Sequence, residues 1–283
     1  MIPSGFRLGV MQGRLSPRPP DRLQAFPHAS WREELSLASD LALDAVEWIY
    51  EAERADENPI CSSTGRLAIR ETQARTGIAV RSVCADYFMV HQLSQPNVVK
   101  RRDNARRLEM LIGWAAEIGA RRILLPLLEE AAPDTEDKRA AVRDAVRACL
   151  PMADAMGVVL GLEMEIPGAE YASFVRSFGH PRVRAYYDTG NSAAQNVDIA
   201  SDVLPLLPML EAVHVKDRVV GGGSVPLGKG SANFSGFFDV LARAHFGGDF
   251  VLQHYFDREP RFDALRAINY VRLELGRANR EAA

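Results

Sequence analysis

The chain of 283 residues is long enough to bury a large core, and its 47% hydrophobic and 25% charged residues are typical of a soluble globular protein. The formal net charge of -3 argues against a binder of phosphate backbones, so we expect no nucleic-acid partner. No apolar stretch is long enough for a signal peptide or a membrane span. Three cysteines without metal-type spacing favour a reduced, cytoplasmic protein.

Eight short apolar segments recur along the chain. Most of them are rich in β-branched or aromatic residues and end in polar or turn residues, which is the pattern of buried parallel strands. The expected strands cover residues 7–12, 45–49, 79–85, 121–127, 158–165, 183–188, 211–216 and 250–256.

Amphipathic helices are predicted between these strands. The segment 98–119 ends at Gly119, and its arginines between 101 and 107 fit a solvated helix face better than a nucleic-acid patch. The segment 135–157 ends at Gly157 and contains Pro151, which predicts a kinked or divided helix. Prolines at 205 and 208 predict a short, broken helix after the sixth strand. The other predicted helices cover residues 31–43, 234–248 and 262–278.

The alternation of strand and helix predicts the fold class. Repeated strand–helix units imply parallel strands with right-handed crossovers, and eight of them in about 250 residues match a (β/α)8 TIM barrel. A doubly wound sheet would want a GxGxxG fingerprint after the first strand, which MQGRLS does not supply. We therefore predict an α/β protein with a single (β/α)8 barrel domain over residues 1–283.

Polar residues recur at the carboxyl ends of the predicted strands, where such barrels carry their active sites. Because side chains alternate along a strand, His214 faces away from its apolar neighbours and points into the barrel. The same alternation directs Glu163 and Asp188 inward, and Gln253 lies near the end of the last strand. Four inward positions on adjacent strands therefore carry oxygen or nitrogen ligands.

This set of side chains would surround one divalent cation. Carboxylate, imidazole and amide groups suit Mn²⁺, Mg²⁺, Co²⁺ or Zn²⁺. The alternative is a structural polar layer, in which His214 is a hydrogen-bonded core residue and the two carboxylates pair with Lys216 or Arg184. The coincidence of position on successive strands favours the metal site.

The motifs around these residues resemble the xylose isomerase-like TIM-barrel superfamily and, within it, the sugar phosphate isomerase/epimerase group. The resemblance spans essentially the whole chain. It implies a divalent metal held by Glu163, Asp188, His214 and the residue at 253, and an enzyme that interconverts ketoses and aldoses or epimerises ketoses. The motifs are LGVMQGRLSP at the first strand, GLE at 163, YYDTGN at 188, HVKD at 214, the following VPLGKG, and FVLQ at 253.

One position departs from that pattern. Many characterised epimerases of this kind carry a glutamate where this chain has Gln253, and an amide oxygen can bind a metal but has no proton to exchange. We therefore expect Glu163 to act as the base on a sugar whose enediolate is stabilised by the metal. Lys216 would stabilise the developing oxyanion or pair with a carboxylate.

Four further residues are candidates for substrate binding. Glu47 would bind a substrate hydroxyl or form a buried ion pair, and Asn191 would donate to the substrate or shape the DTGN turn. Arg218 and Lys229 flank the glycine-rich segment 219–230, which would bind a phosphate or serve as a flexible lid.

The predicted function is a metal-dependent isomerase or epimerase that acts on a sugar or a sugar phosphate. A keto-sugar or keto-inositol dehydratase would use the same enediolate, and a non-catalytic sugar-binding barrel is a third alternative. A repair endonuclease of the same superfamily is disfavoured, because the six histidines supply one clear metal ligand. A homo-oligomer is left open, since exposed helix faces of such barrels commonly pair.

Overall fold

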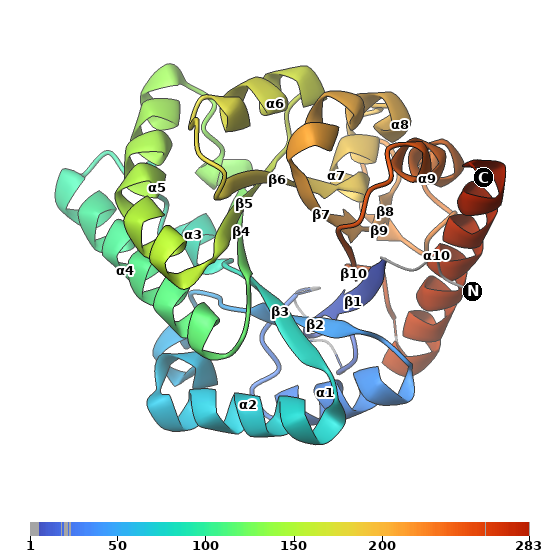
Figure 1. Ribbon diagram of the computed structural model, residues 1–283, viewed down its shortest axis with the longest axis horizontal. Coiled ribbons are helices and arrows are strands. Elements are labelled where there is room, and N and C mark those ends of the chain that lie inside the picture. Colours follow the sequence, from blue (N-terminus) through green and yellow to red (C-terminus); the bar gives the residue numbers. More distant parts are fainter. Residues whose placement is uncertain (1–5, 18, 20–21, 23, 258, 283) are drawn as a thin grey trace.

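A computed structural model describes residues 6–17, 19, 22, 24–257 and 259–282 of the chain. Its parallel strands close into a barrel in the order β1-β10-β7-β6-β5-β4-β3-β2, with helices around the outside (Figure 1). The predicted (β/α)8 barrel is thereby confirmed. The barrel strands are β1 (Arg7–Met11), β2 (Ala45–Ile49), β3 (Ala79–Cys84), β4 (Arg122–Leu127), β5 (Val159–Met164), β6 (Val183–Asp188), β7 (Leu210–Val215) and β10 (Asp249–Leu252).

Helices follow the strands at each predicted place, and a small antiparallel hairpin, β8 (Asp217–Arg218) with β9 (Ser224–Val225), follows β7. The longer helices are α1 (Trp31–Asp40), α2 (Ser63–Thr76), α4 (Val98–Glu117), α5 (Glu136–Met156), α6 (Gly168–Arg176), α9 (Phe234–Arg243) and α10 (Pro260–Ala282). Of these, α2 and α6 lie in segments where no helix was predicted. The shorter ones are α3 (Tyr87–Val90), α7 (Thr189–Ala194) and α8 (Ile199–Asp202), with 3-10 turns η1 (Ala55–Glu57), η2 (Pro59–Cys61), η3 (Glu129–Ala131) and η4 (Leu204–Met209).

The proline-containing segments behave in two ways. The segment after β6 is broken into α7, α8 and η4, as its two prolines predict. By contrast, α5 runs through Pro151 without a break and ends at Gly157, whose φ of 67° is in the left-handed region that favours glycine. The packing of the buried face of α5 outweighs the local penalty of the proline.

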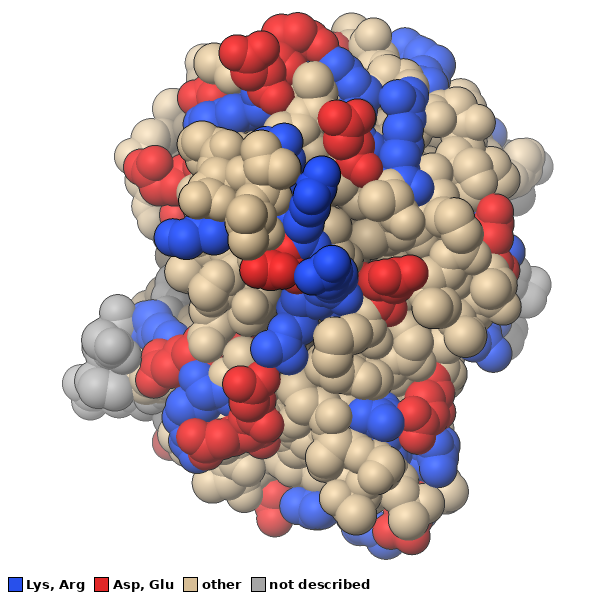
Figure 2. Space-filling view, turned by 90° about the vertical axis from the view of Figure 1, so that its left-hand side faces the viewer, with Lys and Arg blue, Asp and Glu red and all other residues tan. Residues whose placement is uncertain are grey.

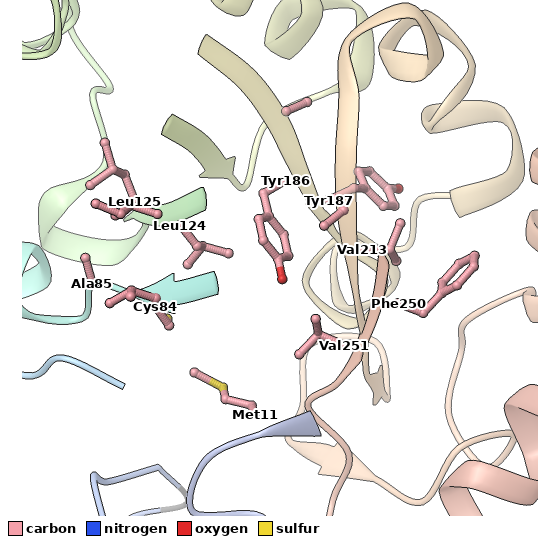
Figure 3. Close-up of a cluster of buried hydrophobic side chains, with 14 of the residues drawn as sticks. Met11, Cys84, Ala85, Leu124, Leu125, Tyr186, Tyr187, Val213, Phe250 and Val251 are labelled. Carbon is pink, nitrogen blue, oxygen red and sulfur yellow. The ribbon is translucent and has the colours of Figure 1, made fainter. Parts of the chain in front are cut away.

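The core has an inner and an outer layer, because successive side chains on a strand point to opposite faces. Figure 3 shows the ring of Tyr186 directed into the barrel and the ring of Tyr187 directed away from it. On the outer side, Tyr187 stacks on Phe237 of α9 with ring centroids 5.8 Å apart, and Phe250 packs on Phe238 at 5.5 Å. The alternation that predicts inward polar residues therefore holds for the apolar ones.

The outer surface over α4 and α5 is rich in basic side chains, which form a band across this side of the molecule (Figure 2). Arg101 donates to the carbonyl of Gln95, Arg106 pairs with Asp103 and Arg107 pairs with Asp56.

In the part of the chain that the structure describes, no helix is long and apolar enough to cross a membrane.

Candidate metal centre and active site

Two carboxylate side chains and one imidazole meet at the carboxyl ends of neighbouring strands. Glu163 comes from β5, Asp188 from β6 and His214 from β7, and all three are buried. One ligand atom from each lies within 4.8 Å of the others. The barrel thus brings together the three strongest of the predicted metal ligands.

Glu47 holds the imidazole of His214. It lies on β2, across the barrel interior from β7. The imidazole Nε2 is 2.5 Å from Glu47 Oε1, while Glu47 Oε2 accepts hydrogen bonds from Ser82 Oγ at 2.6 Å and from the hydroxyl of Tyr186 at 2.7 Å. This network fixes the plane of the imidazole. It also directs the second ring nitrogen of His214 toward the other carboxylates.

That second nitrogen tests whether the residues fit a metal. His214 is 0% exposed, and its Nδ1 has no hydrogen-bond partner among the described residues, although Asp188 Oδ2 lies 3.9 Å away. A buried polar atom without a partner is costly, so such atoms are rare in proteins. A carboxylate that holds one imidazole nitrogen while the other faces an acidic cluster is the arrangement found behind metal-bound histidines. The donor set fits a divalent cation.

The carboxyl groups of the centre differ in their pKa values. Burial raises the pKa of Glu163 to about 8, and Asp188 adds to the rise while His214 opposes it. Burial acts in the same direction on Asp188, but Lys216 and His214 outweigh it and lower the pKa of that carboxyl. Adjacent carboxyls whose pKa values are pushed apart are typical of sites that move protons.

Glu47 and His214 form a buried ion pair. Burial alone would raise the pKa of Glu47, yet the imidazole, with Ser82 and Tyr186, lowers it. The pKa of His214 is raised, because Glu47 outweighs the effect of burial. Since Glu47 is 1% exposed and its oxygens are engaged, it matches the ion-pair alternative for this residue more closely than a contact with substrate.

Asp188 is positioned by the helix that begins directly after it. Its Oδ1 accepts the backbone N–H groups of Gly190 and Asn191 at 2.8 and 2.9 Å and so caps α7. Gly190 lies against Lys216: a Cβ built there would be 2.7 Å from Lys216 Cγ. The glycine of DTGN therefore leaves room for the lysine side chain to reach the centre.

Lys216 and Gln253 complete the ring of polar groups around the centre. The ammonium of Lys216 donates to Asp188 Oδ2 and to Gln253 Oε1, both at 3.1 Å. Gln253 is buried, with 9% of its surface exposed, and its amide oxygen accepts from the same ammonium as the carboxylate of Asp188. In this structure Lys216 pairs with a carboxylate, which was one of the two predicted roles.

Asn191 connects the centre to the rim. Its Nδ2 donates to Glu163 Oε1 at 3.1 Å, and its Oδ1 accepts from Arg218 Nη1 at 3.2 Å. Arg218 also donates to the carbonyl of Gly222 and lies 3.8 Å from Glu165. The helix position of Asn191, three residues after Asp188, places its amide over the carboxylate of Glu163.

A cavity of about 530 Å³ opens above these residues. Glu163, Asn191, Lys216, Arg218 and Gln253 line it, whereas Glu47 and Lys229 do not belong to its described lining. Lys229 is exposed on the loop after β9.

Sequence reasoning missed four polar residues of the cavity wall: Arg22, Gln24, Asp86 and Glu129. Asp86 comes shortly after Cys84 at the end of β3, so the rule that singled out residues at strand ends would have found it. Gln24 lies in the long connection between β1 and α1 and carries no such signal.

The glycine-rich loop after β7 is organised by Asp217. This carboxylate is buried and accepts the backbone N–H groups of Gly228 at 2.9 Å, Gly230 at 2.9 Å and Ala232 at 3.2 Å. These N–H groups are therefore engaged within the protein.

The fold and the site define a (β/α)8 barrel with a candidate divalent-metal centre at the carboxyl ends of its strands. A family model described as xylose isomerase-like TIM barrel matches residues 35–272, and the chain belongs to that family.

Curated relatives and solved structures agree with this assignment. The chain is 26% identical over 258 residues to the L-ribulose-5-phosphate 3-epimerase UlaE of Salmonella heidelberg (strain SL476), covering 88% of this chain and 91% of the relative. The UlaE of Shigella flexneri is also 26% identical, over 261 residues, with the same two coverages. A solved L-ribulose 3-epimerase superimposes with a TM-score of 0.77 at 18% identity over 98% of this chain and 97% of that one. A D-psicose 3-epimerase, solved in the presence of D-fructose, superimposes with a TM-score of 0.76 at 15% identity, over 95% of this chain and 99% of that one.

Proposed function

We propose that this protein is a divalent-metal-dependent sugar isomerase or epimerase in which Glu163 removes the proton next to the sugar carbonyl. The observation that carries the proposal is the buried Nδ1 of His214, which faces Asp188 and Glu163 and has no hydrogen-bond partner in the part of the chain that the structure describes. The cavity above the centre has about 530 Å³, which falls in the range typical of small-molecule sites. The curated relatives, named as epimerases of a ketose phosphate, support the same reaction class.

Each residue of the centre has a distinct part in this proposal. Glu163, Asp188 and His214 would hold the cation, with the amide oxygen of Gln253 as a fourth ligand. When bound, the ion would polarise the sugar carbonyl and stabilise the enediolate. Asn191 orients the carboxylate of Glu163 through Oε1, so that this carboxylate takes the proton from carbon. Glu47 acts as a positioning residue that holds the imidazole of His214.

Lys216 supplies positive charge next to the reacting oxygen. Its ammonium donates to Asp188 and Gln253, two of the residues that would hold the cation, and in the loaded centre it would instead donate to the oxyanion of the substrate. Asn191 and Arg218 line the cavity and would bind hydroxyl groups of the sugar. Lys229 keeps only the role proposed from sequence, as a group that contacts a substrate phosphate from the loop.

The ligand set suits Mn²⁺, Mg²⁺, Co²⁺ or Zn²⁺, and we propose Mn²⁺ as the first ion to test. We propose a ketose or a ketose phosphate as the substrate, because the relatives are named for L-ribulose 5-phosphate. A cytoplasmic location stays a prediction from the sequence, which the three free cysteines support.

Entry of solvent deuterium into a sugar library tests this function. The protein is incubated with Mn²⁺ in deuterium oxide with paired free and 5-phosphorylated ketoses and aldoses, and each sugar is analysed by mass spectrometry. Deuterium at a carbon next to the carbonyl, with an otherwise unchanged molecular formula, is the expected result. Loss of water from the product would identify the dehydratase alternative, and no exchange on any sugar would favour a non-catalytic barrel.

A further inference from the structure

A chain of hydrogen bonds crosses the mouth of the barrel and ends at the metal centre. Arg14 Nη2 donates to Gln24 Oε1 at 3.0 Å, and Gln253 Nε2 donates to the same oxygen at 2.9 Å. Gln24 Nε2 in turn donates to Asp86 Oδ2 at 2.5 Å. At the other end, Lys216 Nζ donates to Gln253 Oε1 at 3.1 Å.

The groups at the ends of this chain fix the direction of every bond in it. Arginine and lysine only donate hydrogen bonds, and an ionised carboxylate only accepts them. Gln24 must therefore turn its oxygen to Arg14 and its N–H₂ to Asp86. Given that oxygen, Gln253 must turn its N–H₂ to Gln24, which leaves its Oε1 on the side of Lys216 and Asp188.

We propose that Gln24 is a positioning residue that holds the amide of Gln253 with its oxygen toward the metal centre, and that this centre is built for a neutral ligand at position 253. The inference rests on the proposed function only for the presence of the cation. The orientation of the amide follows from Arg14, Asp86 and Lys216 alone.

This row of hydrogen bonds also explains why a glutamate at position 253 would not bind the cation more tightly in this protein. Charge alone would favour a carboxylate as the tighter ligand of a divalent cation. In this protein, however, one of its oxygens would face Gln24 Oε1 without a hydrogen between them. Turning Gln24 around would set its N–H₂ against Arg14 and its oxygen against Asp86, which loses two hydrogen bonds. The amide at 253 and the residues behind it thus form one unit.

Replacement of Gln24 by a side chain of similar length tests the positioning role. Gln24→Met keeps the bulk of the side chain but bonds neither Gln253 nor Asp86. We expect isothermal titration with Mn²⁺ alone to show about 10-fold weaker binding, the typical effect of losing a partner behind a metal ligand. The matched control is Gln195→Met, since Gln195 is an exposed glutamine near the same mouth that donates to the carbonyl of Glu165. This control should leave the Mn²⁺ affinity within about twofold of the parent, because its bonds reach no proposed ligand.

A double variant separates hydrogen bonding from packing. In Gln24→Glu with Asp86→Asn, the carboxylate at 24 still accepts from Arg14 and Gln253, and the amide at 86 donates back to it. That amide also keeps an oxygen for the thiol of Cys84, which now donates to Asp86 Oδ1 at 3.2 Å. We expect this pair to retain the parent Mn²⁺ affinity, whereas Gln253→Glu alone gains none.

The outcomes distinguish this inference from the proposed function. If the parent protein binds no stoichiometric Mn²⁺, the metal centre itself is wrong. If the parent binds Mn²⁺ and Gln24→Met binds it equally well, Gln24 does not position Gln253. Equal losses in Gln24→Met and in the double variant would mean that restoring the hydrogen bonds does not restore the affinity, which would overturn the positioning role of Gln24. Tighter Mn²⁺ binding by Gln253→Glu would overturn the inference that the centre is built for a neutral ligand at position 253.

Discussion

The two ends of the barrel both bury charged side chains, but they balance the charges differently. Near the starts of the strands, Arg122 pairs with Asp249 at 2.5 Å and with Glu211 at 3.2 Å, and Arg81 pairs with Asp249 at 2.7 Å. Arg7 also lies 3.8 Å from Asp249, and Arg184 lies 3.9 Å from Glu211, so the arginines outnumber the two carboxylates that they face. At the strand ends, Glu47, Glu163 and Asp188 face His214 and Lys216, and one nitrogen of His214 has no hydrogen-bond partner within the described ranges.

The difference separates a structural network from a functional one. At the strand starts each carboxylate already pairs with arginines, so this network needs no cation as a ligand. A cluster with an excess of carboxylates and an open imidazole nitrogen is stable only if it gains a cation or keeps a proton. At the strand ends, the pKa of Glu163 is raised, so in the metal-free protein this carboxyl keeps a proton that lowers the excess of negative charge.

The largest expected effect is on the catalytic exchange at the strand ends, where Glu163 lies. Glu163→Gln keeps an oxygen for the cation but cannot accept a proton, so we expect substrate exchange to fall by about 10²–10⁴-fold while Mn²⁺ still binds. Deuterium incorporation and Mn²⁺ titration on the same sample measure both quantities. Glu165→Gln is the matched control, because Glu165 lines the cavity without being part of the metal cluster. Exchange at the normal rate in Glu163→Gln would move the base to another residue.

Breaking the arginine–carboxylate network near the strand starts should lower stability and leave metal binding unchanged. Asp249→Asn removes the carboxylate shared by Arg81 and Arg122, and unpairing buried charges costs about 3–5 kcal/mol. We expect urea unfolding to show a loss of this size with an unchanged Mn²⁺ affinity. If metal binding weakened as much as stability, the two ends of the barrel would not be independent.

The two ends should also respond to pH in opposite directions. The pKa of Glu163 is raised by burial to about 8, so the folded metal-free protein loses stability as pH rises from about 4.5 to about 8, at up to about 1.4 kcal/mol per pH unit. For Asp249, burial acts to raise the pKa, but Arg122 and Arg81 lower it below the ordinary value of 3.8. Its contribution to stability is therefore present above pH 3.8 and lost as pH falls through the lowered pKa.

Unfolding of the metal-free protein over this pH range checks the sign. The difference in the free energy of unfolding between the parent and Glu163→Gln should change between about pH 5 and about pH 8, because the parent becomes less stable as pH rises. A pH-independent difference would mean that Glu163 is already ionised in the metal-free protein.

The smallest effect concerns the layer between the two ends. Tyr186→Phe removes the hydroxyl that donates to Glu47 Oε2 at 2.7 Å, and one such bond to a charged group contributes about 1.5–3 kcal/mol. Because Ser82 still donates to that oxygen, we expect a loss near the lower figure, and a severalfold weaker Mn²⁺ affinity through the looser imidazole. Thermal unfolding and Mn²⁺ titration of this variant measure the two effects, and an unchanged metal affinity would mean that Ser82 alone suffices to hold Glu47.

The sequence by itself determined the barrel and the inward direction of its candidate metal ligands. Periodicity is a local property, so the strands, the helices and the alternation that turns Glu163, Asp188 and His214 inward could be predicted from neighbouring residues. The structure brings these three side chains together at the strand ends. The roles that we propose for them stay predictions for the experiments above.

Only the tertiary structure decided which inward residues meet. Alternation gives the face of a strand but not the height of a side chain along the barrel, which depends on closure and on the register between strands. The pairing of β2 with β3 shifts register between Val46 and Glu47, and closure brings Glu47 to His214, 167 residues away. Likewise, Gln24 reaches Gln253 across 229 residues from a connection without regular periodicity. Contacts of this kind depend on the closed barrel, because no local pattern encodes the distance between segments so far apart in the chain.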